Sequence, residues 1–192
     1  MNDFIIYFKT GWEHIISPGA LDHLLFIAAL AAVYLVKDWK QLLILVTAFT
    51  IGHSLTLALS VYDLLRLKDE WVEFLIPLTI VLTALFNFFV KDLSRKPLRL
   101  NYFLALFFGL VHGMGFANTI RFMLSKSQDV FVPLLSFNIG LEAGQIVAVS
   151  ALLVISYLLV NKAGLAQKNW VLALSALAFI AGTQICVERW PF

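Results

Sequence analysis

The sequence has little cysteine, little charge and no concentration of basic residues. A single cysteine, Cys186, cannot form an intrachain disulfide, and neither CxxC nor a Cys/His zinc spacing occurs. The 14 basic and 12 acidic residues form no long basic run and no arginine-rich patch. A disulfide scaffold and a zinc finger are therefore excluded, and we expect no nucleic-acid partner.

Apolar residues dominate the chain instead. Hydrophobic residues make up 61% of it and charged residues only 14%, and the mean hydropathy is +0.89. These values lie outside the range of soluble proteins. Since a membrane-spanning helix needs roughly 20 residues, the 192 residues predict an all-α integral membrane protein whose single domain, residues 1–192, is a compact bundle of about six transmembrane helices.

The expected spans follow from the apolar runs between polar, proline and glycine punctuation. They cover residues of about 21–37, 41–62, 71–90, 100–124, 130–160 and 169–187. The preceding segment Phe4–Ile16 is apolar but short and contains Lys9, Glu13 and His14. Such a segment is typical of an interfacial or partly inserted helix, and it could also pack back into the bundle.

The basic residues of the loops predict an orientation. Eight would lie on one side of the membrane: Lys37, Lys40, Lys91, Arg95, Lys96, Arg99, Lys162 and Lys168. Six would lie on the other: Lys9, Arg66, Lys68, Arg121, Lys126 and Arg189. Because the more basic side faces the cytoplasm, we expect both termini outside.

Polar residues inside the apolar segments are the candidates for function, because an unpartnered polar group in hydrocarbon costs several kcal/mol. The stretch HIISPGALDH places His14, Asp22 and His23 around a Ser-Pro-Gly break. The Asp-His pair could offer a carboxylate and an imidazole to a metal, or the carboxylate could orient the ring. Alternatively, Asp22 caps the first helix and His23 reaches toward the interface.

His53 and His112 form a second group, each inside an expected span among small residues. Ser54 adjoins His53, and Gly109 and Gly113 form a GxxxG pattern, which is typical of closely packed membrane helices. Both histidines could bind a metal, or a hydroxyl or carbonyl of a neighbouring helix could satisfy them.

A third group lies in FNIGLEAGQ, where Asn138, Glu142 and Gln145 recur at i, i+4 and i+7 and share one helix face. A carboxylate buried there needs a cation, an imidazolium or a proton of its own. Glu142 is therefore a candidate ligand, or else a protonated residue that locks helices together.

Further polar residues are expected to support this chemistry. The supporting candidates are Ser54, Asn118, Asn138 and Gln145. Thr79, Thr83 and Asn87 also share a helix face, but hydroxyls and amides are common packing groups in membrane helices, so we interpret this stripe as structural.

The two halves of the chain show a faint repetition. Phe-x3-His occurs in Phe49–His53 and again in Phe108–His112, and each half also carries an acidic residue. Three spans per half would make a 3+3 inverted repeat, an architecture that places binding sites near the bilayer midplane between the halves.

The ordered motifs GWEHI…GALDHLLF, FTIGHSLTLALS, FGLVHGMGFA and FNIGLEAGQ resemble the HupE/UreJ family of bacterial membrane proteins. Its members are associated with hydrogenase and urease gene clusters and are regarded as nickel permeases, so the resemblance implies a bacterial cytoplasmic membrane protein. It also implies a site at His14, Asp22, His23, His53, His112 and Glu142. One departure concerns the position that four residues separate from the Asp-His pair, where known nickel/cobalt transporters carry a histidine. That position is Ser17 here, so His14 could replace it only if the Ser-Pro-Gly break folds it back.

The donor set favours a divalent transition metal as cargo, because imidazoles with carboxylates suit Ni²⁺, Zn²⁺, Fe²⁺, Co²⁺ or Cu²⁺ better than Mg²⁺ or Ca²⁺. We predict that His23, His53 and His112 bind the ion while Asp22 and Glu142 compensate charge, and nickel is the first choice. The expected partners are this ion and the lipid bilayer. Transport ranks first, an intramembrane metal-dependent enzyme with Glu142 as general base second, and a structural or assembly subunit third.

Overall fold

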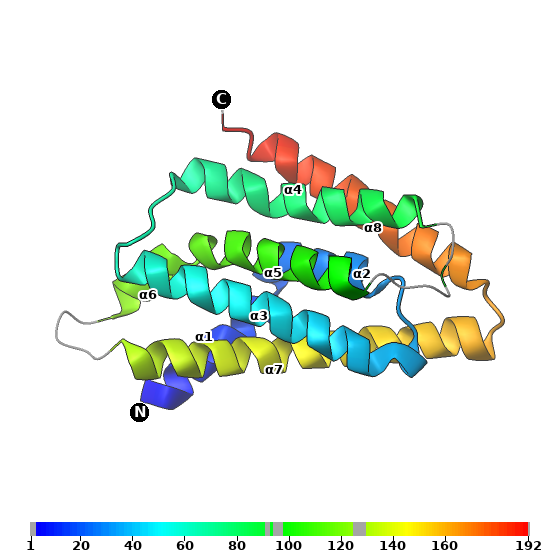
Figure 1. Ribbon diagram of the computed structural model, residues 1–192, viewed down its shortest axis with the longest axis horizontal. Coiled ribbons are helices and arrows are strands. Elements are labelled where there is room, and N and C mark those ends of the chain that lie inside the picture. The colour runs from blue at the N-terminus through cyan, green and yellow to red at the C-terminus, as the bar shows by residue number, and fades with distance from the viewer. Residues whose placement is uncertain (1–2, 91–92, 94–97, 125–129, 192) are drawn as a thin grey trace.

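The computed structural model describes residues 3–90, 93, 98–124 and 130–191. Within these ranges the chain is helical and contains no strand (Figure 1). The α-helices are α1 (Asp3–Ile16), α2 (Leu21–Ala31), α3 (Trp39–Val61), α4 (Asp69–Phe88), α5 (Leu98–Gly115), α6 (Ala117–Met123), α7 (Phe131–Ser156) and α8 (Gln167–Glu188). The expected all-α bundle is confirmed.

Four segments are long and apolar enough to cross a membrane: Val36–Val61, Asp69–Phe88, Phe131–Lys162 and Gln167–Glu188. Two bent helix pairs, α1 with α2 and α5 with α6, raise the number to six if each pair forms one span. The expected spans at 41–62, 71–90, 130–160 and 169–187 agree with these four segments to within a few residues.

The expected spans at 21–37 and 100–124 were wrong as continuous helices. The helix that starts at Leu21 ends at Ala31, so it is about 16 Å long and too short to cross the bilayer alone. It follows α1 at a bend of 65°, and α5 meets α6 at a bend of 45° near Phe116. The Ser-Pro-Gly stretch indicated the first bend, but apolar run length could reveal neither the end of α2 at Ala31 nor the bend near Phe116, because the residues on both sides of each are hydrophobic.

The N-terminal helix belongs to the bundle. Of the interpretations open for Phe4–Ile16, packing back into the bundle is confirmed, because α1 packs along α7. Tyr7, Gly11 and Ile15, spaced four apart on one face of α1, are buried, whereas Lys9 and Glu13 are exposed and form an ion pair. Two of the three polar residues of this segment, Lys9 and Glu13, therefore lie on its outer face, whereas His14 lies on its inner side.

Three helix pairs make the most extensive contacts: α3 with α5, α1 with α7, and α4 with α8. Glycines allow the backbones of the first two pairs to touch. A Cβ on Gly109 would collide with the carbonyl oxygen of Phe49, and one on Gly11 would collide with that of Phe137. The packing role expected for the GxxxG pattern is confirmed, since Gly113 also lies against the carbonyl oxygen of His53.

These two pairs are equivalent, which supports an inverted repeat. Gly109 meets Phe49 and Gly52 meets Leu106, whereas Gly11 meets Phe137 and Gly140 meets Phe8. The sequence spacing is the same in both pairs, because the two contact positions on each helix differ by three in residue number. Figure 1 shows α3 and α7 running in opposite directions, so the two halves are inverted.

The repeat does not pair the motifs that first indicated it. Phe49–His53 in α3 corresponds to Phe137–Leu141 in α7, and the helix of His112 corresponds to that of His14. The similarity between Phe49–His53 and Phe108–His112 was therefore misleading, because α3 and α5 are packing partners and not repeat equivalents.

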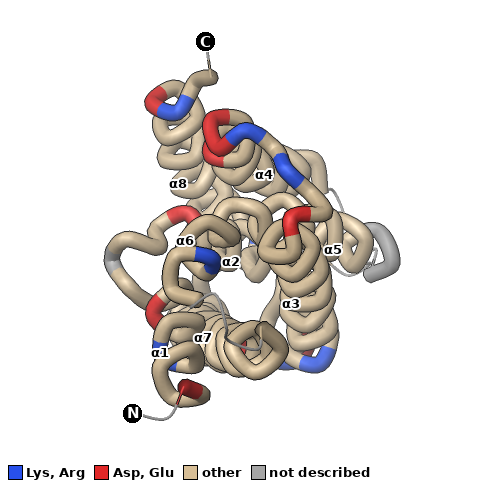
Figure 2. Tube along the Cα trace, turned by 90° about the vertical axis from the view of Figure 1, so that its left-hand side faces the viewer, with Lys and Arg blue, Asp and Glu red and all other residues tan. Residues whose placement is uncertain are grey.

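The outer surface of the bundle is apolar. Large hydrophobic side chains of α3, α5 and α8 are more than half exposed, among them Ile51, Leu55, Phe107 and Ile180. Viewed along the bundle in Figure 2, lysine, arginine, aspartate and glutamate gather mostly at helix ends and turns. This distribution fits helices that face lipid.

The glycine contacts yield a stability prediction. Gly11→Ala and Gly109→Ala should each lower the free energy of unfolding by roughly 1–3 kcal/mol, because a Cβ at either position forces the backbones apart. Denaturant titration of the purified protein in detergent would measure this. Gly19→Ala is the control, since its Cβ would meet only Ser17 Oγ at 3.9 Å. Equal stability of Gly109→Ala and native protein would contradict the close packing.

Candidate functional site

All four histidines of the chain come together in the bundle interior. The ring centroids of His14 and His23 are 4.4 Å apart, those of His23 and His112 are 5.0 Å apart, and those of His14 and His53 are 5.8 Å apart. The four side chains come from α1, α2, α3 and α5. We call these four residues the histidine cluster.

The break between α1 and α2 assembles half of the cluster. Ser17 is extended, a 3₁₀ turn follows at Pro18–Ala20, and the chain bends by 65°. Proline fits the start of such a turn, because its fixed φ matches the turn and no hydrogen bond from its missing N–H is needed there. His14 in the last turn of α1 is thereby folded back onto His23 in the first turn of α2.

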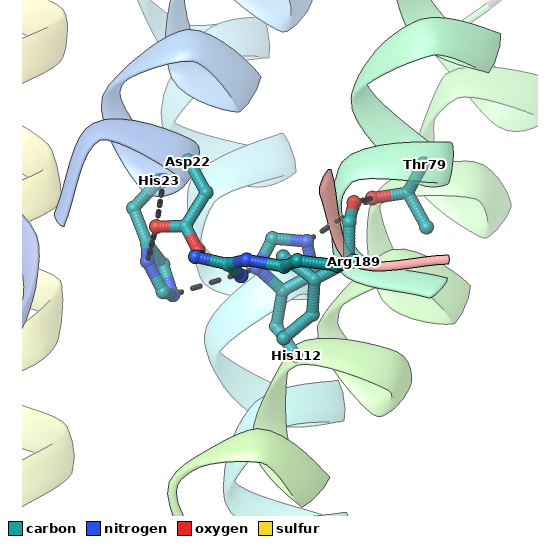
Figure 3. A network of polar contacts seen from close by, with 6 residues as sticks. Asp22, His23, Thr79, His112 and Arg189 are labelled. Atoms are coloured by element: carbon teal, nitrogen blue, oxygen red, sulfur yellow. Dashed lines mark hydrogen bonds and ion pairs between the residues drawn. The ribbon is translucent and has the colours of Figure 1, made fainter. Parts of the chain in front are cut away.

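A chain of polar contacts crosses the cluster (Figure 3). Arg189 lies 3.6 Å from Asp22 Oδ2, and Asp22 Oδ1 lies 3.0 Å from Nδ1 of His23. The other nitrogen of that ring, Nε2, is 3.4 Å from Nδ1 of His112. Thr79 Oγ1 completes the chain at 3.1 Å from Nε2 of His112.

Asp22 orients a ring and is not a helix cap. Ala20 occupies the N-cap position of α2, where no side chain caps the helix. Asp22 Oδ1 instead accepts from the backbone N–H of His23 at 2.9 Å and contacts its ring. The capping alternative was therefore wrong, and so was the placement of His23 near the interface, since His23 is buried. The carboxylate and imidazole form the kind of pair that fixes the tautomer of a metal ligand.

Several buried polar atoms of the cluster have no hydrogen-bond partner in the described part of the chain. They are Nε2 of His14, both ring nitrogens of His53, and Oδ1 of Asn138. His53 is fully buried at 0% exposure. An unsatisfied buried polar group costs about 1–3 kcal/mol, so these atoms lower the free energy of unfolding of the protein.

The cluster opens into a cavity of about 490 Å³. His14, Asp22, His23 and His112 line its inner part, and Glu13, Glu73 and Arg189 also line it. Glu13 and Glu73 are exposed. A small hydrated ion can therefore reach the rings from the end of the bundle that carries these residues.

The third predicted group lies beside the cluster, between α3 and α7. Thr47 donates to Glu142 Oε1 at 2.7 Å, and Thr50 donates to Gln145 Oε1 at 2.8 Å. Ser54 donates to the carbonyl oxygen of Thr50 at 2.7 Å. The structure thus places Glu142 and Gln145 in an α3–α7 polar interface, whereas the hydroxyl of Ser54 bonds within α3.

The other two supporting candidates, Asn138 and Asn118, lie in different parts of the bundle. Asn138 faces His53 without reaching hydrogen-bond geometry, and its side-chain amide donates to the carbonyl oxygen of Leu134 at 2.8 Å. Asn118 instead donates to both oxygens of Asp69, at 3.0 and 2.9 Å, and lines a different pocket. Asn138 therefore belongs to the surroundings of the cluster, whereas Asn118 joins helices α6 and α4.

Two residues of the contact chain were not among the predicted site residues. Thr79 stands in the stripe that was interpreted as structural, and its hydroxyl is the partner from a neighbouring helix that was left open for His112. Arg189 follows the last helix and lies far from Asp22 in sequence, so no local signal could have found it.

In the described part of the chain, no three His, Cys, Asp or Glu side chains already stand in a geometry that would hold one metal ion. The cluster is a set of neighbouring rings that do not surround one point, and the ring planes of His23 and His112, for example, are inclined at 82°. Shared coordination by three of them requires their rings to turn toward one point.

Comparison with models of protein families gives a match that covers nearly the whole chain. The sequence model described as "HupE / UreJ protein" matches residues 1–189. The chain belongs to the HupE / UreJ family. No curated protein and no solved structure matches it. For this HupE / UreJ protein, the resemblance inferred from the four motifs is confirmed.

The contact chain yields a second prediction. Thr79→Val should lower the free energy of unfolding by about 1–3 kcal/mol, because it leaves Nε2 of buried His112 without its partner. Thr83→Val is the matched control on the same helix, since the hydroxyl of Thr83 bonds only to the carbonyl oxygen of Thr79. Denaturant titration of both variants would test the contact, and equal stabilities would contradict it.

Proposed function

We propose that this HupE / UreJ protein carries a divalent transition-metal ion, nickel in the first place, across the membrane through the histidine cluster. The observation that carries this proposal is the set of unpartnered imidazole nitrogens on His14 and His53, buried beside a cavity that His23 and His112 line. Protein groups leave these nitrogens free, and a metal ion would satisfy them.

The chemistry of the donors selects the class of ion. Neutral imidazole suits borderline metals such as Ni²⁺, Co²⁺, Zn²⁺, Fe²⁺ and Cu²⁺, whereas Mg²⁺ and Ca²⁺ prefer oxygen ligands. Asp22 adds one negative charge and holds the ring of His23. Because the rings are not already closed around one point, binding would be reversible, as a carrier needs.

Arg189 supports a cationic cargo. Its guanidinium lies 3.6 Å from Asp22 and lines the cavity, so a cation of the protein already faces this carboxylate. An entering metal ion would compete with Arg189 for Asp22, which would couple entry to a displacement of the arginine. Glu142, by contrast, is held by Thr47, and we assign it charge compensation beside the site and not direct coordination.

The cavity and the two termini share one end of the bundle. In Figure 1 both N and C lie toward the end where α3 finishes and α4 begins, and Figure 2 looks onto that end. This is the less basic side of the membrane, which the positive-inside rule places outside the cytoplasm. The proposed direction is therefore uptake from outside.

Metal binding by the purified protein tests the proposal. Equilibrium dialysis with Ni²⁺, Co²⁺, Zn²⁺, Fe²⁺ and Cu²⁺, each alone, should give stoichiometric binding to the native chain. His53→Ala and His112→Ala should lose it. Asp22→Asn should bind about 10- to 100-fold more weakly, because it loses the charge that orients His23.

Glu188→Gln is the matched control for Asp22→Asn, since Glu188 is exposed on α8 and bonded to Gln184. Because the chain has only four histidines, all in the cluster, imidazole signals in the spectra of bound Cu²⁺ report on this site alone. Absence of binding below millimolar concentration for all five ions would overturn the proposal.

The orientation forms a separate prediction. A reporter that is active only outside the cytoplasm should work when fused after Phe192, and a reporter that requires the cytoplasm should fail there. Insertion at Gly164, in the turn at the opposite end, should give the reverse result. The same reporter active at both positions would contradict the six-span topology.

A further inference from the structure

Polar groups continue beyond the histidine cluster along α4. Thr79 contacts His112, Thr83 donates to the carbonyl oxygen of Thr79 at 2.7 Å, and Asn87 follows one turn later. The three residues are spaced by four and share one face of the helix. Thr79 and Thr83 are buried, so this stripe points into the bundle and away from lipid.

The stripe leads to a second pocket on the other side of the cluster. This inner pocket has a volume of about 40 Å³, room for little more than one water molecule or one small ion. Thr83, Asn87 and Asn101 are its polar lining residues. Ionisable side chains are absent from its described lining, so its chemistry is that of neutral oxygen and amide groups.

Hydrogen bonds hold the two asparagines so that their carbonyl oxygens remain available. The side-chain NH₂ group of Asn87 donates to the carbonyl oxygen of Ala29 at 2.7 Å and to the hydroxyl of Ser175 at 3.1 Å. Asn101 donates to the hydroxyl of Tyr34 at 2.7 Å. With both amide hydrogens of Asn87 and one of Asn101 bonded to the scaffold, Oδ1 is the acceptor that each asparagine can offer to a cation.

Three phenylalanine rings lie between the cluster and the inner pocket. The ring of Phe26 is 5.1 Å from that of Phe49 and 5.7 Å from that of Phe108, and all three are at least 97% buried. On one side Phe26 and Phe49 contact His112, at 5.4 and 5.1 Å. On the other side Phe108 lines the inner pocket.

We propose that the inner pocket, with Thr83, Asn87 and Asn101, is a second ion site of neutral oxygen ligands, and that Phe26, Phe49 and Phe108 form a plug that separates it from the histidine cluster. This inference rests on the proposed function and extends it by naming the route that the metal ion takes after the histidines. The cargo of the inner pocket is the same divalent transition metal.

Because the ligand atoms differ, the affinity for the metal ion decreases from the histidine cluster to the inner pocket. Borderline metals bind imidazole nitrogen more strongly than amide or hydroxyl oxygen. An ion in the neutral inner pocket lacks both imidazole and carboxylate, so it is held briefly and released. While they are packed, the phenyl rings occupy the space between the two sites and leave only the hydroxyls of Thr79 and Thr83 beside them, which hinders a continuous leak.

Cysteine labelling tests the plug without using any metal. In a Cys186→Ala background, Asn101→Cys in sealed vesicles should react with a membrane-impermeant maleimide only from the face opposite the cavity. Adding Phe108→Ala should allow reaction from the cavity face as well. Phe107→Ala is the matched control on the same helix, because Phe107 is 57% exposed and points outward. Phe108→Leu serves if the alanine variant does not fold. Two outcomes would overturn the plug. One is labelling that stays one-sided after the Phe108 substitution, and the other is labelling of Asn101→Cys from both faces without that substitution.

Uptake and binding, measured on the same variants, test the inner site. Thr83→Val and Asn87→Leu should bind Ni²⁺ in detergent within about twofold of the native chain, and should transport it into proteoliposomes at least fivefold more slowly. Thr183→Val is the control, since Thr183 is exposed on α8 and its hydroxyl bonds only to the carbonyl oxygen of Phe179. Uptake within twofold of native in both variants would overturn the inner site. Absence of binding and uptake in the native chain would instead refute the proposed function, and the labelling result would still decide whether the plug exists.

Discussion

Direct backbone contact between helices at glycine is the constraint on which the rest of this structure depends. In a bilayer the lipid tails are as apolar as the side chains, so helices associate through close packing and not through the hydrophobic effect. Gly11 and Gly140 bring α1 against α7, and Gly52 and Gly109 bring α5 against α3. Gly113 rests on the backbone of His53, so the approach that joins α3 to α5 also places His53 and His112 near each other. A larger side chain at any of these positions would separate the helices and disperse the histidines.

The scaffold is repeated, but its chemistry is not. His14 and His112 occupy equivalent places, three residues after Gly11 and Gly109. The equivalent of His53, however, is Leu141, which is fully buried. Asp22 and His23 stand after the break between α1 and α2 and contribute the carboxylate and the fourth ring. The inverted repeat therefore supplies two similar halves of the scaffold. Differences in sequence between the halves, such as His53 against Leu141, place the metal-binding candidates together beside the cavity.

The polar side chains in the interior differ in whether a neighbouring protein group bonds to them. The contact chain from Arg189 to Thr79 satisfies Asp22, His23 and His112, whereas His53 and Nε2 of His14 remain unpartnered within the described residues. Beyond the cluster the donors become neutral and the separating side chains become aromatic. The ion route that we propose would pass imidazole, phenyl ring and amide in this order.

The sequence by itself determined the membrane class, the apolar helices and which side chains are too polar for their surroundings, because these depend on composition and on the cost of transfer into hydrocarbon. His14, His23, His53 and His112 could be selected on that ground alone. Only the tertiary structure decided which of them meet, since glycine contacts between residues more than 50 positions apart join α3 to α5 and α1 to α7, and the bend after α1 turns His14 toward His23. It also decided that Thr79 contacts His112, that Arg189 pairs with Asp22 and that Glu142 bonds to Thr47, because a polar residue's partner depends on the distance between helices, which no local pattern contains.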